Sequence, residues 1–431
     1  MEQVRNQDRA RNPDSNLPIN PSFPISTTSS SQSKLQKFLT SDRPSTAAPS
    51  RRILFVLNEA YFFLSHRLAL ARAVQAAGFE VHVAAPADHV WAPSGFSTDE
   101  IERQGFQFHP IPMSRRGGNP FVELRTLFAL VALYRRFRPE LVHHLTIKPN
   151  LYGGLAARIA KVPKVVFSVT GLGQVFVGTG PLARLRKTLI STVMKRSMGH
   201  PRARVIFQNP DDLSRFVAAR IVDVDRARVI LGSGVDVGSF AADPPPKDEF
   251  PLVMLCSRLI WEKGIREFVE AAQIVRQQGV PARFALVGDT RASNPRAVPR
   301  ATLEEWEKNK VVEWWGFRAD IAQVLAEARV VCLPSTYGEG VPKILLEAAA
   351  AGRAIITTDI AGCKESVVDG VSGLLVPPGD VGALVDALRK LVVDHDLAAQ
   401  MGRAGRKLAE EKFDVRTTVS ATMGVYGELD H

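Results

Sequence analysis

Short apolar segments that alternate with helical stretches constrain the fold of this 431-residue chain more than any other feature. The first series of candidate strands covers residues 53–57, 81–85, 141–144, 165–169 and 204–208. After a break, the series restarts at residues 252–256, 284–287, 311–315, 330–333 and 354–358. Strands that are apolar throughout are typical of a parallel sheet covered by helices on both faces. The pattern predicts an α/β protein with two doubly wound, Rossmann-like domains that face a cleft, with helices that include residues 64–77 and 265–277.

Shifts in composition suggest the domain boundaries. Residues 1–50 are rich in Ser, Pro, Asn and Gln with few large apolar side chains, so we expect a disordered arm that cannot offset its ordering entropy. We assign residues 51–240 to an N-terminal domain, 241–249 to a proline-rich linker and 250–408 to a C-terminal domain. Residues 409–431 are expected to form a C-terminal helix that returns to the N-terminal domain.

The net charge of +11 is concentrated in one part of the chain. Residues 141–210 contain eleven Lys or Arg and no acidic residue. Such a field attracts nucleic acid, an anionic membrane face or a phosphorylated substrate, although a soluble protein can also simply be basic. No basic motif is interleaved with aromatic residues, so we expect no nucleic-acid partner.

Cysteine usage and hydropathy favour a cytoplasmic protein. Cys256, Cys332 and Cys363 have no metal-ligand spacing and are expected to be reduced. The longest apolar run, residues 126–134, is about half of what a bilayer crossing needs. The first residues lack the apolar segment of a secretory signal.

Two carboxylates, Glu339 and Glu347, flank a turn that opens a helix. Pro342 suits the first turn of that helix, and the free N–H groups near Gly340 and Val341 would form an anion site. A carboxylate in such a place can accept two hydroxyl groups of a ribose or hexose. The alternative is one glutamate that complements the helix dipole and one that is solvated.

A second candidate segment follows the strand at residues 252–256. Arg258 and Lys263 lie in the loop before the helix at residues 265–277. Fixed cations at the end of a parallel sheet can hold a diphosphate and stabilise its charge as a leaving group. Together with the two glutamates, they predict a site for a nucleotide-sugar.

These motifs resemble those of the family-four retaining glycosyltransferases of GT-B fold. The resemblance covers about residues 52–428 and is most specific in the second half. It is carried by the segments at residues 257–264 (Ser-Arg-Leu-x-x-x-Lys-Gly), 316–320, 333–335, 339–347, 362–365 and 373–377.

The resemblance implies roles for individual residues. The donor-binding residues would be Arg258, Lys263, Phe317, Arg318, Glu339, Gly340, Val341, Pro342 and Glu347. Within this set, Arg258 and Lys263 would hold the donor diphosphate, Glu347 the ribose, and Glu339 the transferred sugar, with Phe317 and Arg318 along the base. The resemblance further implies retention at the anomeric carbon, no metal and no cofactor.

The first domain departs from the common family pattern, because residues 58–60 are Asn-Glu-Ala where many relatives carry a glycine pair. Together with residues 142–149 and 169–173, it resembles a subgroup that extends lipid-linked glycans for surface polysaccharides or protein glycosylation. Relatives place a catalytic histidine at the end of the fourth strand, which corresponds to His143 or His144 here. Since a strand alternates its faces, only one of the two can point into the cleft.

Residues 181–196 predict a basic amphipathic helix. Leu182, Leu185, Leu189 and Val193 recur at helical spacing among basic residues. Such a helix suits an anionic bilayer surface, and the alternative is a core-packed helix with a solvated basic face. The residues expected on the acceptor or membrane side are His66, Arg67, Lys148, Arg186, Lys187, Lys195 and Arg196.

The leading hypothesis is an enzyme at the inner face of the plasma membrane. It would move a hexose or N-acetylhexosamine from a nucleotide-diphosphate donor, expected to be UDP, to a polyprenyl-diphosphate-linked saccharide. The expected catalytic residues are Arg258, Lys263, Glu339 and one of His143 and His144. The alternatives are a nucleotide-sugar 2-epimerase of similar fold, a soluble glycosyltransferase with a small acceptor, and a non-catalytic nucleotide- or RNA-binding protein.

Overall fold

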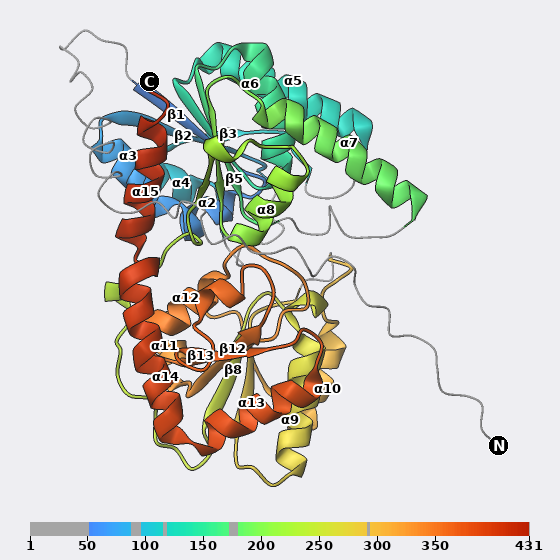
Figure 1. The fold of residues 1–431 in the computed structure, drawn as a ribbon, viewed down its shortest axis with the longest axis vertical. Helices are drawn as coiled ribbons and strands as arrows, with labels where there is room; N and C mark the ends of the chain where they lie inside the picture. Colours follow the sequence, from blue (N-terminus) through green and yellow to red (C-terminus); the bar gives the residue numbers. More distant parts are fainter. Residues whose placement is uncertain (1–50, 88–95, 115–118, 172–179, 291–293, 431) are drawn as a thin grey trace.

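The structure, a computed structural model, describes residues 51–87, 96–114, 119–171, 180–290 and 294–430. Two parallel sheets form two α/β domains, one above the other in Figure 1. The predicted fold, two Rossmann-like domains that face each other, is confirmed. The predicted N-terminal arm at residues 1–50 lies outside the described residues.

The N-terminal domain is built on a seven-stranded sheet with the order β3-β2-β1-β4-β5-β6-β7, in which every pair is parallel. Its strands are β1 (Arg51–Val56), β2 (Phe79–Ala85), β3 (Gln107–Pro110), β4 (Leu141–Leu145), β5 (Lys164–Val169), β6 (Ala203–Phe207) and β7 (Ala227–Val229). Its helices are α2 (Ala60–His66), α3 (Leu68–Ala76), α4 (Asp99–Arg103), α5 (Pro120–Phe137), α6 (Gly154–Ala160), α7 (Pro181–Met198) and α8 (Pro210–Ala218). Short helical turns are η1 (Pro149–Gly153), η3 (Val224–Arg226) and η4 (Val237–Ser239).

Both faces of this sheet are buried, as continuous apolar strands require. One face packs under α5, α6 and α7, through Leu130, Ala156 and Met194 among others. The other packs under α2, α3 and the last helix of the chain, through residues such as Phe63 and Val74. The strands meet these two layers alternately, so the strands inside the sheet, β2, β1, β4, β5 and β6, contribute to both cores.

One helix boundary differs from the sequence prediction. The helix predicted at residues 64–77 is two helices, α2 and α3, because the backbone of Arg67 leaves the helical region at φ −129° and ψ −3°. Neither Pro nor Gly marks this position, so local propensity gives no sign of the break.

The C-terminal domain is built on a six-stranded parallel sheet with the order β10-β9-β8-β11-β12-β13. Its strands are β8 (Leu252–Cys256), β9 (Arg283–Val287), β10 (Glu313–Gly316), β11 (Val330–Leu333), β12 (Ala354–Thr358) and β13 (Gly373–Val376). Its helices are α9 (Ile265–Gln277), α10 (Arg300–Lys308), α11 (Ile321–Glu327), α12 (Lys343–Ala350), α13 (Val381–Val393) and α14 (His395–Leu408), with the turns η5 (Trp261–Lys263) and η6 (Lys364–Ser366).

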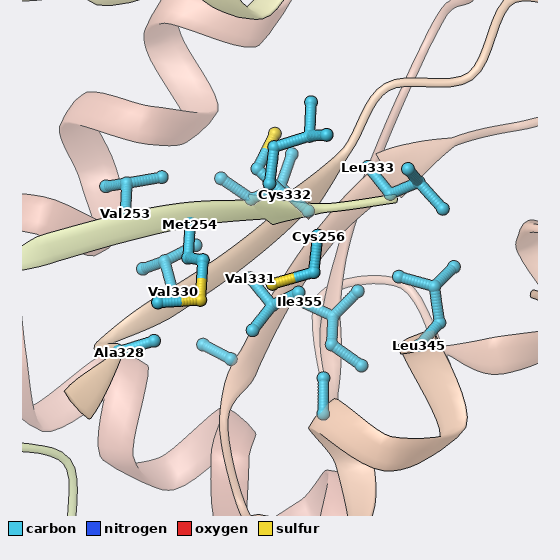
Figure 2. Close-up of a cluster of buried hydrophobic side chains, with 14 of the residues drawn as sticks. Val253, Met254, Cys256, Ala328, Val330, Val331, Cys332, Leu333, Leu345 and Ile355 are labelled. Atoms are coloured by element: carbon cyan, nitrogen blue, oxygen red, sulfur yellow. The ribbon is translucent and has the colours of Figure 1, made fainter. Parts of the chain in front are cut away.

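The cysteines of this domain lie in its hydrophobic core. Figure 2 shows Cys256 of β8 and Cys332 of β11 among aliphatic side chains, with Leu345 of α12 packed nearby. All three cysteines are buried and free, and burial raises the pKa of the Cys363 thiol to about 12. The cysteines therefore act as small apolar side chains, as expected.

The chain crosses between the domains twice, and the two crossings are hydrogen-bonded to each other. Val235 belongs to the crossing from the N-terminal to the C-terminal domain. Its carbonyl accepts from Val415 N at 2.9 Å, and its N–H donates to the carbonyl of Phe413 at 2.8 Å. The return runs through η7 (Ala409–Phe413) into α15 (Val415–Gly427), which packs on α3. In Figure 1 the red C-terminal helices run along one side of both domains.

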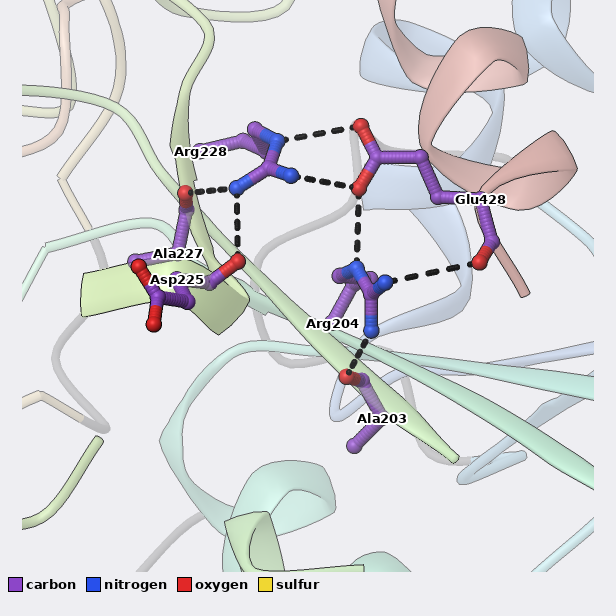
Figure 3. A network of polar contacts seen from close by, with 6 residues as sticks. All are labelled: Ala203, Arg204, Asp225, Ala227, Arg228 and Glu428. Atoms are coloured by element: carbon purple, nitrogen blue, oxygen red, sulfur yellow. Dashed lines mark hydrogen bonds and ion pairs between the residues drawn. The ribbon is translucent and has the colours of Figure 1, made fainter. Parts of the chain in front are cut away.

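A polar network attaches the end of the chain to the N-terminal sheet (Figure 3). Glu428 accepts from Arg204 Nε at 2.8 Å and from Arg228 Nη2 at 2.7 Å. Arg228 Nε donates to the second carboxylate oxygen at 3.0 Å. One carboxylate thus joins β6 and β7 to the segment after α15.

We expect Glu428→Gln to loosen the C-terminal helix. Charge-assisted hydrogen bonds to a carboxylate contribute about 1.5–3 kcal/mol, and the amide would keep only part of them. Amide hydrogen exchange in α15 should therefore accelerate by at least tenfold, since about 1.4 kcal/mol corresponds to a factor of ten. Glu304→Gln, which removes an exposed pair with Arg300, is the control and should leave exchange in α15 unchanged. Equal exchange in α15 for both variants would contradict the role of Glu428.

Candidate active site

The loops after β8 and β11 meet because these two strands are neighbours in the sheet. The loop after β8 carries Arg258 and Lys263 and ends at Gly264, whose φ of +73° suits glycine. Any Cβ at Gly264 would overlap the carbonyl oxygen of Pro334, which follows β11. Close packing of these loops therefore requires a glycine directly after Lys263.

Lys263 and Glu339 form an ion pair at this edge of the sheet. Both side chains are nearly buried, at 8% and 11% exposure. Ser335, which is fully buried, donates to the other oxygen of Glu339 at 2.6 Å. A carboxylate with one oxygen held by a hydroxyl and the other by an ammonium has a fixed orientation.

Glu347 lies about one turn into α12, which begins at Lys343 with Pro342 as its N-cap. Its side chain is buried and accepts from Lys343 Nζ at 3.0 Å. Burial raises the pKa of Glu347, and Lys343 opposes that shift. The charge of Glu347 also contributes to the raised pKa of Tyr61, after the larger effect of burial, which places α2 of the N-terminal domain near this carboxylate.

The N-terminal domain contacts the turn between the two glutamates. Asn209 Nδ2 donates to the carbonyl of Glu339 at 3.2 Å. A Cβ at Gly340 would lie 2.8 Å from the carbonyl oxygen of Thr170, so the backbones of the two domains approach closely here. Lys364 and Asp211 form a further interdomain ion pair at 2.8 Å. The two domains therefore meet at the predicted sugar-binding turn.

Cationic groups gather beside this turn from both domains. Burial lowers the pKa of His66 well below its usual value, and the charges of Lys343, Arg67 and Arg258 lower it further. The charges of Arg258 and Lys343 of the C-terminal domain thus act on His66 of the N-terminal domain. Arg67 is buried, and burial lowers its pKa to about 10. An electrostatic environment of this sign favours a phosphorylated ligand.

His143 and His144 lie inside the N-terminal domain on opposite faces of β4. His143 bonds to Tyr426 Oη at 2.7 Å and to Ser168 Oγ at 2.8 Å, and His144 bonds to Tyr134 Oη at 2.8 Å. Neither imidazole is exposed beyond 1%. Burial lowers the pKa of both, that of His144 to about 3. These contacts favour packing roles, and a catalytic role for either histidine stays a prediction.

Phe317 and Arg318 follow the edge strand β10. Phe317 is 46% exposed, while Arg318 forms two hydrogen bonds with Asp320, at 2.7 and 2.5 Å. Their predicted place along the base stays a prediction. Lys148, expected on the acceptor side, donates to Glu123 and to the carbonyl of Ser114 on the side of the domain covered by α5.

The helix predicted at residues 181–196 is α7. Arg186, Lys195 and Arg196 are exposed and Lys187 is half-buried. Leu185 and Leu189 are exposed as well, so the face that packs on the core is instead formed by Ile190, Val193, Met194 and Met198. The alternative, a core-packed helix with a solvated basic face, therefore describes this part of α7, except that Leu185 and Leu189 do not belong to the packed face.

No group of three His, Cys, Asp or Glu in the described part of the chain could hold a metal ion. Two Asp-x-Asp sequences occur, but Asp225 precedes β7 and Asp394 caps α14. Both places belong to the amino ends of the strands, far from the carboxyl ends that carry the site. Metal independence stays a prediction.

Sequence reasoning did not assign several residues that the structure brings to the site. Ser335 stood in a motif without a role, and its contact with Glu339 depends on the path of the turn. Asn209 precedes Pro210 at a helix start and caps α8, a signal that could have been found. Tyr61 and Lys343 reach the site only through the packing of α2 and the spacing within α12.

Two facing Rossmann-like domains, with cationic and carboxylate side chains at the carboxyl ends of the second sheet, define the architecture of GT-B glycosyltransferases. The solved structure of a sucrose-phosphate synthase from Thermosynechococcus elongatus is similar to this chain. The TM-score is 0.72 at 19% identity, over 88% of this chain and 99% of the other. At this identity, the likeness supports the fold alone.

Family models and relatives agree with this architecture. The model described as glycosyl transferase 4-like matches residues 52–207, and that described as glycosyl transferases group 1 matches residues 250–394. The chain therefore belongs to the family-four type of glycosyltransferases, and it is a glycosyltransferase.

Two relatives match along most of their length. An N,N'-diacetylbacillosaminyl-diphospho-undecaprenol α-1,3-N-acetylgalactosaminyltransferase of Campylobacter jejuni is 28% identical, over 79% of this chain and 91% of its own. A UDP-Gal:α-D-GlcNAc-diphosphoundecaprenol α-1,3-galactosyltransferase of Escherichia coli is 27% identical, over 78% and 87%. The names of both relatives contain a sugar linked to undecaprenyl diphosphate.

Proposed function

We propose that this enzyme transfers a hexose or N-acetylhexosamine from a UDP-sugar to a saccharide linked to a polyprenyl diphosphate. The observation that carries the proposal is the cluster of Lys263, Glu339 and Ser335 beside Glu347, at a turn that the N-terminal domain contacts. The acceptor class is supported by the names of the two relatives, and UDP by the name of one of them.

In the proposed reaction, the bond between the anomeric carbon and the donor phosphate oxygen breaks, the acceptor hydroxyl oxygen forms the new bond, and its proton passes to the departing diphosphate. Arg258 and Lys263 stabilise the charge of the departing diphosphate, so no metal is needed. Glu339 accepts hydrogen bonds from the transferred sugar and Glu347 from the ribose. The product retains the anomeric configuration of the donor.

The acceptor determines where the enzyme works. No helix in the described residues is long and apolar enough to cross a membrane. Because the proposed acceptor is anchored in the membrane by its lipid, we place the enzyme on the cytoplasmic face of the plasma membrane, attached peripherally to anionic lipid. The basic, acid-free segment at residues 141–210 supplies the charge for that attachment.

The test offers a panel of UDP- and GDP-sugars with polyprenyl-diphosphate-linked saccharides. We expect the mass of the lipid-linked acceptor to increase by one sugar with a UDP-sugar, with and without a chelator. Nuclear magnetic resonance of the product should give the same anomeric configuration as the donor. Isomerisation of a UDP-sugar without acceptor would contradict the proposal and support an epimerase.

A further inference from the structure

Two helices of the N-terminal domain expose large apolar side chains. Phe121 and Phe128 of α5 are 81% and 62% exposed, and Leu185 and Leu189 of α7 are 68% and 63% exposed. Leu124 of α5, at 49%, lies between the two phenylalanines at helical spacing. These five residues are called the α5–α7 apolar patch below. Single exposed apolar side chains are ordinary, but stripes on two associated helices indicate a binding surface.

The two halves of the patch belong to the same side of the domain. Both α5 and α7 pack against α6 and η1, and both cover the same face of the sheet. Each helix leads into a parallel strand of this sheet, β4 or β6, and therefore runs antiparallel to it. The amino-terminal halves of both helices, which carry the patch, thus lie toward the carboxyl ends of the strands.

That end of the domain is the end that faces the candidate site. Thr170 follows β5 and Asn209 follows β6, and both approach the turn at Glu339 and Gly340. Figure 1 shows α5 and α7 extending outward together, above the boundary between the domains. A surface that covers the patch would therefore lie next to the opening between the domains.

The charges around the patch have one sign. The only acidic side chain of the two helices, Glu123, is buried and paired with Lys148. The exposed charged residues of the two helices are all basic: Arg125, Arg184 and Arg186 belong to the same halves as the patch, and Arg135, Arg136, Lys195 and Arg196 belong to the last turns. A second copy of this chain would bring like charges together, whereas an anionic bilayer offers both phosphates and an apolar layer.

We propose that the α5–α7 apolar patch inserts into the surface of an anionic bilayer, with the surrounding basic side chains at the lipid phosphates. The apolar insertion makes part of the binding resistant to salt, because salt screens only the charges. This docking places the opening between the domains against the membrane. The purpose of this docking rests on the proposed lipid-linked acceptor, whereas the binding of the patch to a bilayer does not depend on that proposal.

The test measures cosedimentation of the full chain with vesicles of phosphatidylcholine, with and without phosphatidylglycerol. We expect the wild-type protein to bind vesicles with phosphatidylglycerol more tightly than vesicles of phosphatidylcholine alone, to which only the apolar insertion contributes. The variant Phe121→Ser/Phe128→Ser/Leu185→Ser/Leu189→Ser should bind these vesicles at least about tenfold more weakly, since it loses four inserted side chains. The substitutions are at exposed positions, so the fold should persist.

Control variants distinguish the effect of the patch from the loss of exposed apolar side chains elsewhere and from the loss of positive charge. Phe250→Ser/Val393→Ser removes two exposed apolar side chains of the C-terminal half, 50% and 69% exposed, and should bind as the wild type does. Arg184→Gln/Arg186→Gln/Lys195→Gln should lose most of the preference for phosphatidylglycerol. Raised salt should weaken wild-type binding, yet leave it above that of the patch variant.

Three outcomes would overturn the proposal: no binding by the wild-type protein, equal binding by the patch variant, or a wild-type dimer in solution that the patch variant abolishes. A soluble acceptor with a short prenyl chain separates this proposal from the proposed function. The patch variant should transfer sugar to that acceptor at the wild-type rate. If neither the wild-type protein nor the patch variant transfers sugar to this soluble acceptor, while vesicle binding still depends on the patch, the proposed acceptor is wrong and the proposed docking stands.

Discussion

Replacing Lys263 with Ala is expected to lower sugar transfer by about a hundredfold to a thousandfold, the loss typical of removing one group that stabilises a developing charge. The ammonium of Lys263 is nearly buried beside Glu339, and a water molecule that filled its place would not supply the lost positive charge. The measurement is the rate of product formation at saturating acceptor, with the free energy of unfolding determined in parallel. Lys308→Ala, an exposed lysine on α10, is the control and should transfer sugar at the wild-type rate.

The effect of Lys263→Ala in the Glu339→Gln variant distinguishes two possible roles of Lys263. If it only neutralises Glu339, then adding Lys263→Ala to Glu339→Gln should cost no further activity. If it binds the donor diphosphate, the double variant should be slower than Glu339→Gln by at least about tenfold. Wild-type activity in Lys263→Ala would remove this residue from the proposed mechanism.

Replacing Gly264 with Ala is expected to destabilise the C-terminal domain by about 3 kcal/mol or more. The left-handed backbone costs a side chain about 1 kcal/mol, and the overlap with the Pro334 carbonyl adds strain. Gly279→Ala is a matched control, because Gly279 has a similar φ of +75° but no atom within 4 Å of its Cβ position. It should cost only about 1 kcal/mol.

Unfolding of this domain can be followed by intrinsic fluorescence. Four of the five tryptophans, Trp261, Trp306, Trp314 and Trp315, belong to the C-terminal half of the chain. Gly264→Ala should also reduce sugar transfer under conditions in which the domain stays folded, because Lys263 precedes it directly. Equal stability of the two glycine variants would show that the crowding at Pro334 is relieved without cost.

The alternation of apolar strands and helices predicted the two sheets because buried parallel strands need a continuous apolar composition. The prediction at residues 252–256 coincides with β8, and that at residues 265–277 with α9. The strands β3, β7 and β13 were missed. They are short, and two of them, β3 and β7, contain polar or charged residues at the edge of the sheet, where one side is left without a partner.

The candidate site was only partly accessible to sequence reasoning. The motifs gave Lys263, Glu339 and Glu347, because their spacing relates them to a turn and a helix. The pairing of Lys263 with Glu339 could not be predicted, since it depends on how two loops pack. The surroundings of His143 depend on Tyr426, which is 283 residues further along the chain. Contacts over such separations have no local signal.

The two segments that cross between the domains, at Val235 and at Val415, are hydrogen-bonded to each other and form one connection. Because the two crossings are hydrogen-bonded to each other, a change in the relative position of the domains would have to move both segments together. The domains also contact each other away from the crossings, through Asn209 with Glu339 and Lys364 with Asp211. Separation of the domains would break both of these contacts. A chain cut within residues 409–414 would remove one of the two crossings and leave the contacts of Asn209 and Lys364 to hold the domains together.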